Sequence, residues 1–70
     1  MSANNQLVIL KENRKYEIWE NHCVDNEFDK ETSTRLAFAT SLRKAIIFAK
    51  KYCDEEMVEY GFTIWESALK

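Results

Sequence analysis

Proline is absent from this chain of 70 residues, and Gly61 is its only glycine. These scarcities exclude a proline-rich linker and a glycine-rich phosphate-binding loop. The uninterrupted apolar runs are short, whereas a helix that crosses a bilayer needs about 20 mostly apolar residues. We therefore expect no membrane-spanning segment. The net charge of −2 is too small to point by itself to nucleic acid or a membrane surface.

Cysteine is also scarce, with Cys23 and Cys53 as the only two. A small secreted domain that relies on disulfides usually carries more. The first residues are polar and do not resemble a signal peptide. We therefore expect a reduced, cytoplasmic protein. The spacing leaves open whether the two cysteines pair.

Apolar residues make up 46% of the chain and aromatic residues 13%. That content suffices for one compact core if a sheet and a helix share it. The length allows one domain, so we expect residues 1–70 to form a single unit, with residues 1–6 as a flexible tail.

Residues 16–24 and 32–39 alternate in the period of two that is typical of strands. Residues 57–66 alternate again, around the one glycine. Residues 7–10 are uniformly apolar and either begin a strand or cap the edge of the core. Charged or polar residues fill 11–15 and 25–31, where we expect turns.

Between the second and third of these strands the period changes to that of an amphipathic helix, starting at Leu42. Thr40 and Ser41 are candidate N-caps, and the helix should end near residues 54–56. The order strand-strand-helix-strand predicts an α+β domain, in which a three-stranded sheet has one helix packed on one face. The last strand could pair with residues 16–24 or with residues 32–39, and the pattern does not decide between them.

Two hexapeptides nearly repeat, namely residues 16–21 and 62–67. Each runs aromatic, polar, isoleucine, tryptophan, glutamate, small polar. The alternation places Trp19 and Trp65 on the face without the helix. Exposed indoles on an open sheet are typical of interaction surfaces. Alternatively, the tryptophans only pack against each other or under residues 7–10, which is a structural role.

Charge favours the interaction hypothesis, because Glu17 and Glu59 are predicted on the same face as the indoles. The loops add further acidic residues at 25–31 and 54–56. We therefore predict a non-catalytic protein-binding module, in which Trp19, Trp65, Glu17 and Glu59 dock a basic surface of another protein. An exposed sheet face or edge could also form a homodimer.

The alternative function is nucleic-acid binding through the polar side of the helix. That side carries Arg43, Lys44, Lys50 and Lys51, and sheet aromatics could stack on single-stranded bases. Acidic side chains on the same strands would repel phosphates, so we rank this hypothesis second.

Catalytic and metal-binding patterns are weak. His22, Cys23 and Cys53 are the only soft ligands, and a zinc site usually needs four, arranged as close pairs. Adjacent strand residues such as His22 and Cys23 point to opposite faces. We therefore predict no enzyme activity, no metal and no cofactor.

The helix and final strand carry a recognisable order of residues. Residues 40–49 read Thr-Ser-Leu-Arg-Lys-Ala-Ile-Ile-Phe-Ala, and residues 60–64 read Tyr-Gly-Phe-Thr-Ile. This part, less than half of the chain, resembles a bacteriophage inhibitor of bacterial RNA polymerase, one of the small acidic host-takeover proteins. The arginine-rich end of that inhibitor has no counterpart in residues 66–70. The resemblance implies a non-enzymatic protein that acts by binding, and it assigns no individual residue.

Overall fold

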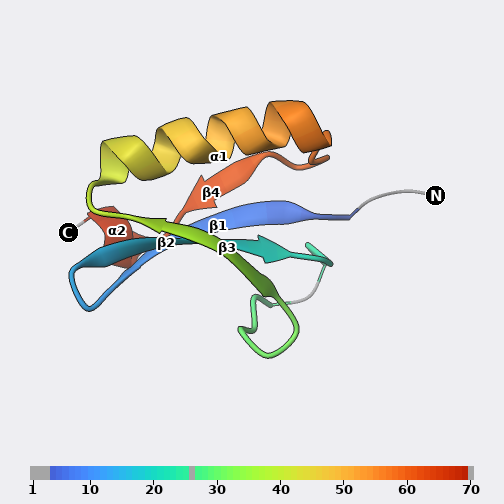
Figure 1. Cartoon of the computed structure of the whole chain (residues 1–70). Coiled ribbons are helices and arrows are strands. Elements are labelled where there is room, and N and C mark those ends of the chain that lie inside the picture. Colours follow the sequence, from blue (N-terminus) through green and yellow to red (C-terminus); the bar gives the residue numbers. More distant parts are fainter. Residues whose placement is uncertain (1–3, 26, 70) are drawn as a thin grey trace.

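The computed structural model describes residues 4–25 and 27–69. It forms one sheet with a long helix across one face (Figure 1). The elements are β1 (Gln6–Glu12), β2 (Lys15–Asn21), β3 (Thr34–Ala39), α1 (Leu42–Glu56), β4 (Phe62–Ile64) and the short α2 (Glu66–Leu69).

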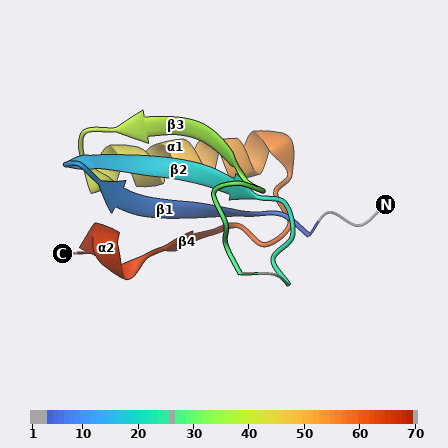
Figure 2. The ribbon, with the colours of Figure 1, turned by 90° about the horizontal axis from the view of Figure 1, so that it is seen from below.

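The sheet has four strands in the order β3-β2-β1-β4 (Figure 2). β1 and β2 form an antiparallel hairpin in which Val8 lies opposite Trp19 and Ile9 opposite Ile18. β4 is parallel to β1, with Val8 beside Thr63. β3 is antiparallel to β2, and a register shift between Ile18 and Trp19 leaves Leu36 as an extra residue in β3.

The hairpin turn consists of Asn13 and Arg14, which both have positive φ values, 52° and 66°. A two-residue hairpin loop with positive φ at both positions has the handedness that matches the twist of the strands. The predicted turn at residues 11–15 is confirmed, although it is only two residues long.

Helix α1 follows its sequence signals closely. The Ser41 side chain accepts a hydrogen bond from the Lys44 backbone N–H, as an N-cap does. After Glu56, Met57 adopts a left-handed conformation, and its backbone N–H donates a hydrogen bond to the Cys53 carbonyl, which closes the helix. Ala45 and Ala49 are completely buried against Leu7, Ile9 and Ile18, which form the centre of the core.

The α+β class and the single long helix are confirmed, but the three-stranded sheet is wrong. Residues 7–10 are neither a cap nor a cover for the tryptophans; they form the central strand β1, between β2 and β4. The last strand therefore pairs with neither of its two predicted partners. A strand buried on both faces is apolar throughout rather than alternating, and all four of these residues are buried.

The predicted strand over residues 57–66 is too long. Only Phe62–Ile64 is extended and paired, because Met57 and Gly61 both have positive φ values that interrupt a strand. Residues 57–61 instead form a turn, and α2 replaces most of the predicted C-terminal tail. Of the predicted N-terminal tail, residues 1–3 lie outside the described residues, while Asn4, Asn5 and Gln6 are hydrogen-bonded to the fold.

Candidate functional site

Trp19 and Trp65 do lie on the helix-free side of the sheet, but a third aromatic ring stands between them. Phe28, from the loop between β2 and β3, meets Trp19 edge-to-face at 5.9 Å between ring centroids. It meets Trp65 in the same way at 5.1 Å. Trp19 is half-buried and Trp65 is 40% exposed. The predicted open indole face is therefore partly closed by the protein's own loop.

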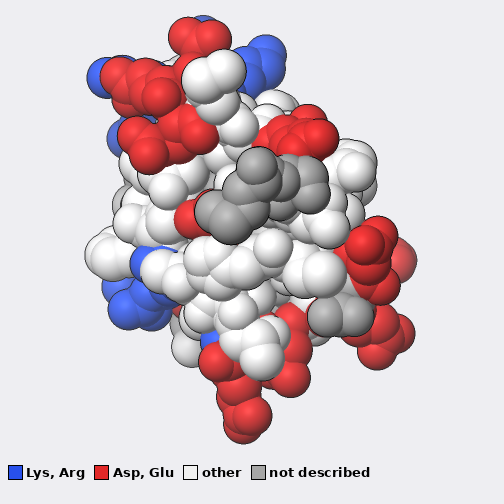
Figure 3. Space-filling model, turned by 90° about the vertical axis from the view of Figure 1, so that its right-hand side faces the viewer, with Lys and Arg blue, Asp and Glu red and all other residues white. Residues whose placement is uncertain are grey.

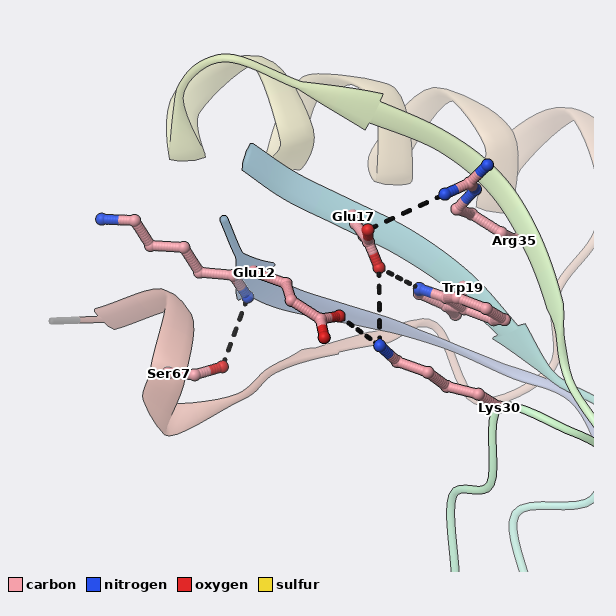
Figure 4. Close-up of polar contacts among 7 residues, drawn as sticks. Glu12, Glu17, Trp19, Lys30, Arg35 and Ser67 are labelled. Carbon is pink, nitrogen blue, oxygen red and sulfur yellow. Dashed lines mark hydrogen bonds and ion pairs between the residues drawn. The ribbon is translucent and has the colours of Figure 1, made fainter. Parts of the chain in front are cut away.

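Glu17 lies on this face as predicted, but its charge is already paired (Figure 4). One carboxylate oxygen accepts a hydrogen bond from Trp19 Nε1 at 2.9 Å, and it lies 3.9 Å from Lys30 Nζ. The other oxygen lies 3.8 Å from the Arg35 guanidinium. Lys30 also forms an ion pair with Glu12 and approaches the Trp19 ring. The side chain of Glu17 is only 15% exposed, so it offers little to a partner.

Glu59 lies elsewhere, because the segment predicted to be a strand is a turn. Its backbone N–H donates to the Asn5 side chain at 3.3 Å. The neighbouring Tyr60 N–H donates to the Asn5 backbone carbonyl at 3.2 Å. The four residues predicted to form one docking surface are therefore not brought together: Trp19, Trp65 and Glu17 share the sheet face, and Glu59 does not.

Acidic residues gather instead at one end of the molecule. The C-terminus of α1, the turn after it and the loop between β2 and β3 all lie at the right-hand end in Figure 1. Figure 3 views this end and shows carboxylates at its upper, right-hand and lower margins, with Lys and Arg side chains beside the upper group and on the left. Eight of the twelve acidic residues lie in these segments. We call this surface the acidic end: Asp25, Glu27, Asp29, Glu31, Asp54, Glu55, Glu56 and Glu59, with Met57 and Tyr60.

The N-terminal residues hold the two acidic segments on either side of β1. The Asn4 backbone carbonyl accepts a hydrogen bond from the Val24 N–H at 2.7 Å, and Asn4 forms a bridge with Cys23. Asn5 accepts from Glu59 and Tyr60, and its side-chain amide donates to Glu20 at 2.9 Å. The hydrogen bonding of Asn4 and Asn5 could not be predicted from the sequence, because asparagine in a polar N-terminal segment is also typical of a disordered tail.

Two large apolar side chains are exposed at the acidic end. Met57 is 82% exposed and Tyr60 is 50% exposed. Both belong to the turn at residues 57–61, where the sequence predicted a strand. Three carboxylates directly precede Met57 in the chain, and Glu59 lies between Met57 and Tyr60. An apolar centre with a charged rim has the composition of a protein-binding surface.

The charges of α1 oppose the dipole of their own helix. Arg43 and Lys44 occupy its first turn, and its last residues are Asp54, Glu55 and Glu56. The N-terminus of a helix carries partial positive charge and its C-terminus partial negative charge. Each of these side chains therefore destabilises the helix by about 0.3–1 kcal/mol. The arrangement weakens the helix but strengthens the negative potential at the acidic end.

Two titratable groups near Glu20 have raised pKa values. Burial, followed by the nearby Glu20 carboxylate, raises the pKa of Tyr52. The Tyr52 hydroxyl also donates a hydrogen bond to Glu20 at 3.3 Å. Burial, and then Glu20, raises the pKa of the Cys53 thiol. Both groups are therefore held in the neutral form, which does not favour Cys53 as a nucleophile.

The four basic residues of the alternative site are all exposed on α1. Lys44 and Lys51 line two hollows on the side of the helix that faces β3. Arg43 and Lys50 line neither. The nucleic-acid hypothesis stays a prediction, since no contact of the described residues bears on it.

Both cysteines are free thiols. Among residues 4–25 and 27–69, no cluster of three or more His, Cys, Asp or Glu side chains could hold a metal ion. No helix in the same residues is long and apolar enough to cross a membrane. No family model matches the chain, and neither the curated proteins nor the solved structures contain a match to it.

Proposed function

We propose that this protein is a non-catalytic binding module that docks a basic surface of another protein through its acidic end. The observation that carries the proposal is a partial segregation of charge along the molecule, which extends 36 Å along its longest axis. Eight of the twelve acidic residues lie in the segments at the acidic end, beside the basic Lys30, Lys50 and Lys51. Arg14, Lys15, Arg43 and Lys44 lie toward the opposite end, near the hairpin turn and the start of α1 (Figure 1).

The length of the molecule makes this segregation effective. Charges are screened over about 8 Å at physiological ionic strength, which is much less than the 36 Å extent. A partner at the acidic end therefore experiences mainly the carboxylates there. They would steer a basic surface during encounter, while Met57 and Tyr60 would supply the apolar area buried in the complex.

The proposal keeps the partner predicted from the sequence and changes the surface that meets it. Glu59 remains in the proposed surface, whereas the paired Glu17 and the partly covered Trp19 support it less well. Inhibition of a host protein in the cytoplasm, which the resemblance to phage inhibitors implies, is one role that such docking could serve.

A basic peptide of alternating lysine and valine, Lys-Val-Lys-Val-Lys-Val with blocked ends, is a defined probe of this surface. In NMR titrations at low salt, we expect amide shifts at residues 54–60, which decrease at physiological salt. Glu55→Lys with Glu56→Lys should remove these shifts. Glu66→Lys, which reverses a carboxylate in α2 at the opposite end of the molecule (Figure 1), is the control and should leave them unchanged. Shifts of equal size at every carboxylate would contradict the proposal.

A further inference from the structure

A second surface lies between β3 and α1 and shares only Glu55 with the acidic end. Ile18, Ala37, Phe38, Ala39, Thr40, Lys44 and Phe48 line a pocket of about 350 Å³. A smaller hollow of about 170 Å³ follows along the same side of the helix, lined by Phe48, Lys51, Tyr52 and Glu55. The two share Phe48, whose ring stacks on Tyr52 at 6.0 Å. Together they form a groove along α1.

Small side chains in β3 create the larger pocket. Ala37 lies opposite Ile18 and Ala39 opposite Tyr16, so both alanines face the helix. Across Ile18, the position of β1 in register with Ala37 holds the large, fully buried Ile9. Alanine at the outer strand leaves the space that isoleucine fills at the centre of the sheet.

The strand beside this pocket has a free edge. β3 is the outer strand of the sheet and, among the residues that the structure describes, pairs only with β2 (Figure 2). The extra residue Leu36 interrupts its first half, so residues 37–39 form the regular part, directly beside the pocket. An open edge with a neighbouring apolar pocket is how proteins bind extended peptides by adding a strand.

The charge of the groove identifies the kind of peptide. Residues 32–53, which form β3 and most of α1, contain five lysines and arginines and no acidic residue. Lys44 lines the pocket. On the other face of β3, Arg35 is 56% exposed, and Lys15 lies 4.8 Å from the Phe38 ring. Side chains of an added strand alternate between the two faces and would therefore meet basic residues on both.

We propose that this groove binds an extended peptide segment that alternates acidic and apolar residues, as an added strand on β3. Backbone groups of residues 37–39 hydrogen-bond the peptide. One apolar side chain enters the pocket between Ala37, Ala39 and Phe48, and the acidic side chains, which point to the opposite face of the added strand, meet Lys15 and Arg35. The proposal concerns a different surface and a partner of opposite charge from the acidic end, so either can fail without the other.

The test is an NMR titration with Glu-Val-Glu-Val-Glu-Val, blocked at both ends, beside the lysine-valine peptide. We expect the acidic peptide to shift the amides of residues 37–40 and 44–48, and the basic peptide to leave them unchanged. Lys15→Glu should weaken binding by about tenfold, as loss of a charge-assisted contact does. Lys50→Glu, on α1 and outside both hollows, is the matched control and should weaken it far less.

Ala39→Leu fills the pocket and should abolish binding while the dispersion of the NMR spectrum shows that the fold persists. Absence of shifts at β3 with millimolar acidic peptide overturns the proposal, as do equal shifts with the basic peptide. Shifts of residues 37–40 that appear on raising the protein concentration alone would also overturn it, because a second copy would then be the occupant. Should Ala39→Leu fail to fold, the comparison of Lys15→Glu with Lys50→Glu decides.

Discussion

Phe28 meets both indoles of the helix-free face, and this single side chain determines how open that face is. Sequence analysis identified Trp19 and Trp65 from the repeated hexapeptide but assigned no role to Phe28, because it lies in a polar loop that has no period. A lone aromatic residue in a charged loop is a weak signal that the loop folds back onto an apolar surface. Two indoles on a sheet face without a helix favour such a contact, because both would otherwise be exposed to solvent.

Truncation of Phe28 to alanine should therefore expose the indoles and destabilise the protein. Two edge-to-face pairs are lost, each worth roughly 0.5–1.5 kcal/mol beyond buried area, so we expect a loss of about 2 kcal/mol. Urea unfolding measures this loss, and tryptophan emission should shift to longer wavelength. Phe38→Ala is the control, since Phe38 is 57% exposed. Equal effects of the two substitutions would show that Phe28 covers nothing.

Cys53 provides a test of the electrostatic environment near Glu20. Its pKa is raised by burial and by the Glu20 carboxylate, and only the thiolate reacts with alkylating reagents. In a Cys23→Ser protein at pH 8, we expect slow alkylation of Cys53 that accelerates as the pH rises. Unfolding in urea should increase the rate at pH 8, and Glu20→Gln should increase it to a smaller extent. A native rate as fast as the unfolded rate would contradict the assigned environment.

At the scale of elements, the sequence predicts those with clear local signals. Ser41 and the apolar period define α1, and alternation defines most of β2 and β3. The sequence does not decide whether residues 7–10 begin a strand or cap the core, because four consecutive apolar residues have no period. This uniformity is nevertheless what a strand buried on both faces requires. The parallel pairing of β1 with β4 could not be predicted, because it depends on where α1 returns the chain.

The hairpin turn carries backbone strain that one substitution should relieve. Arg14 has a φ of 66°, a conformation that glycine adopts without steric cost, and Asn-Gly is the preferred pair for such turns. We expect Arg14→Gly to stabilise the protein by about 1 kcal/mol in chemical denaturation. Lys15→Gly, one residue further and within β2, should instead destabilise it. A loss of stability for both would mean that the turn is not strained.

The inverted charges of α1 predict a conflict between stability and binding. Asp54→Lys with Glu55→Lys places cations at the negative end of the helix dipole, so the free energy of unfolding should rise by about 0.3–1 kcal/mol per site. The gain should shrink in 1 M salt, which screens it. The same double variant should weaken binding of the lysine-valine peptide at the acidic end. If the free energy of unfolding of the double variant fell instead, the native acidic residues would not be destabilising the helix.

For the whole molecule, the acidic composition of the loops can be read from the sequence, but their place in the fold cannot. Loops at 25–31 and 54–56 were recognised as acidic, yet only the fold shows that both lie at one end, held by Asn4 and Asn5. The surface is defined by the direction of α1 across the sheet, and no local pattern carries that information. The groove beside β3 was missed for the same reason, because it lies between two elements.

Site-specific photo-crosslinking in the producing cell tests the central claim most directly. A photoreactive phenylalanine analogue would replace Tyr60 at the acidic end, Trp65 on the sheet face, or Ile47 on the outer side of α1. We predict that the probe at position 60 captures a protein with a basic surface, that Glu55→Lys with Glu56→Lys abolishes the capture, and that the other two positions capture it poorly. Capture of one defined protein from position 65 or 47, with none from position 60, would contradict docking through the acidic end.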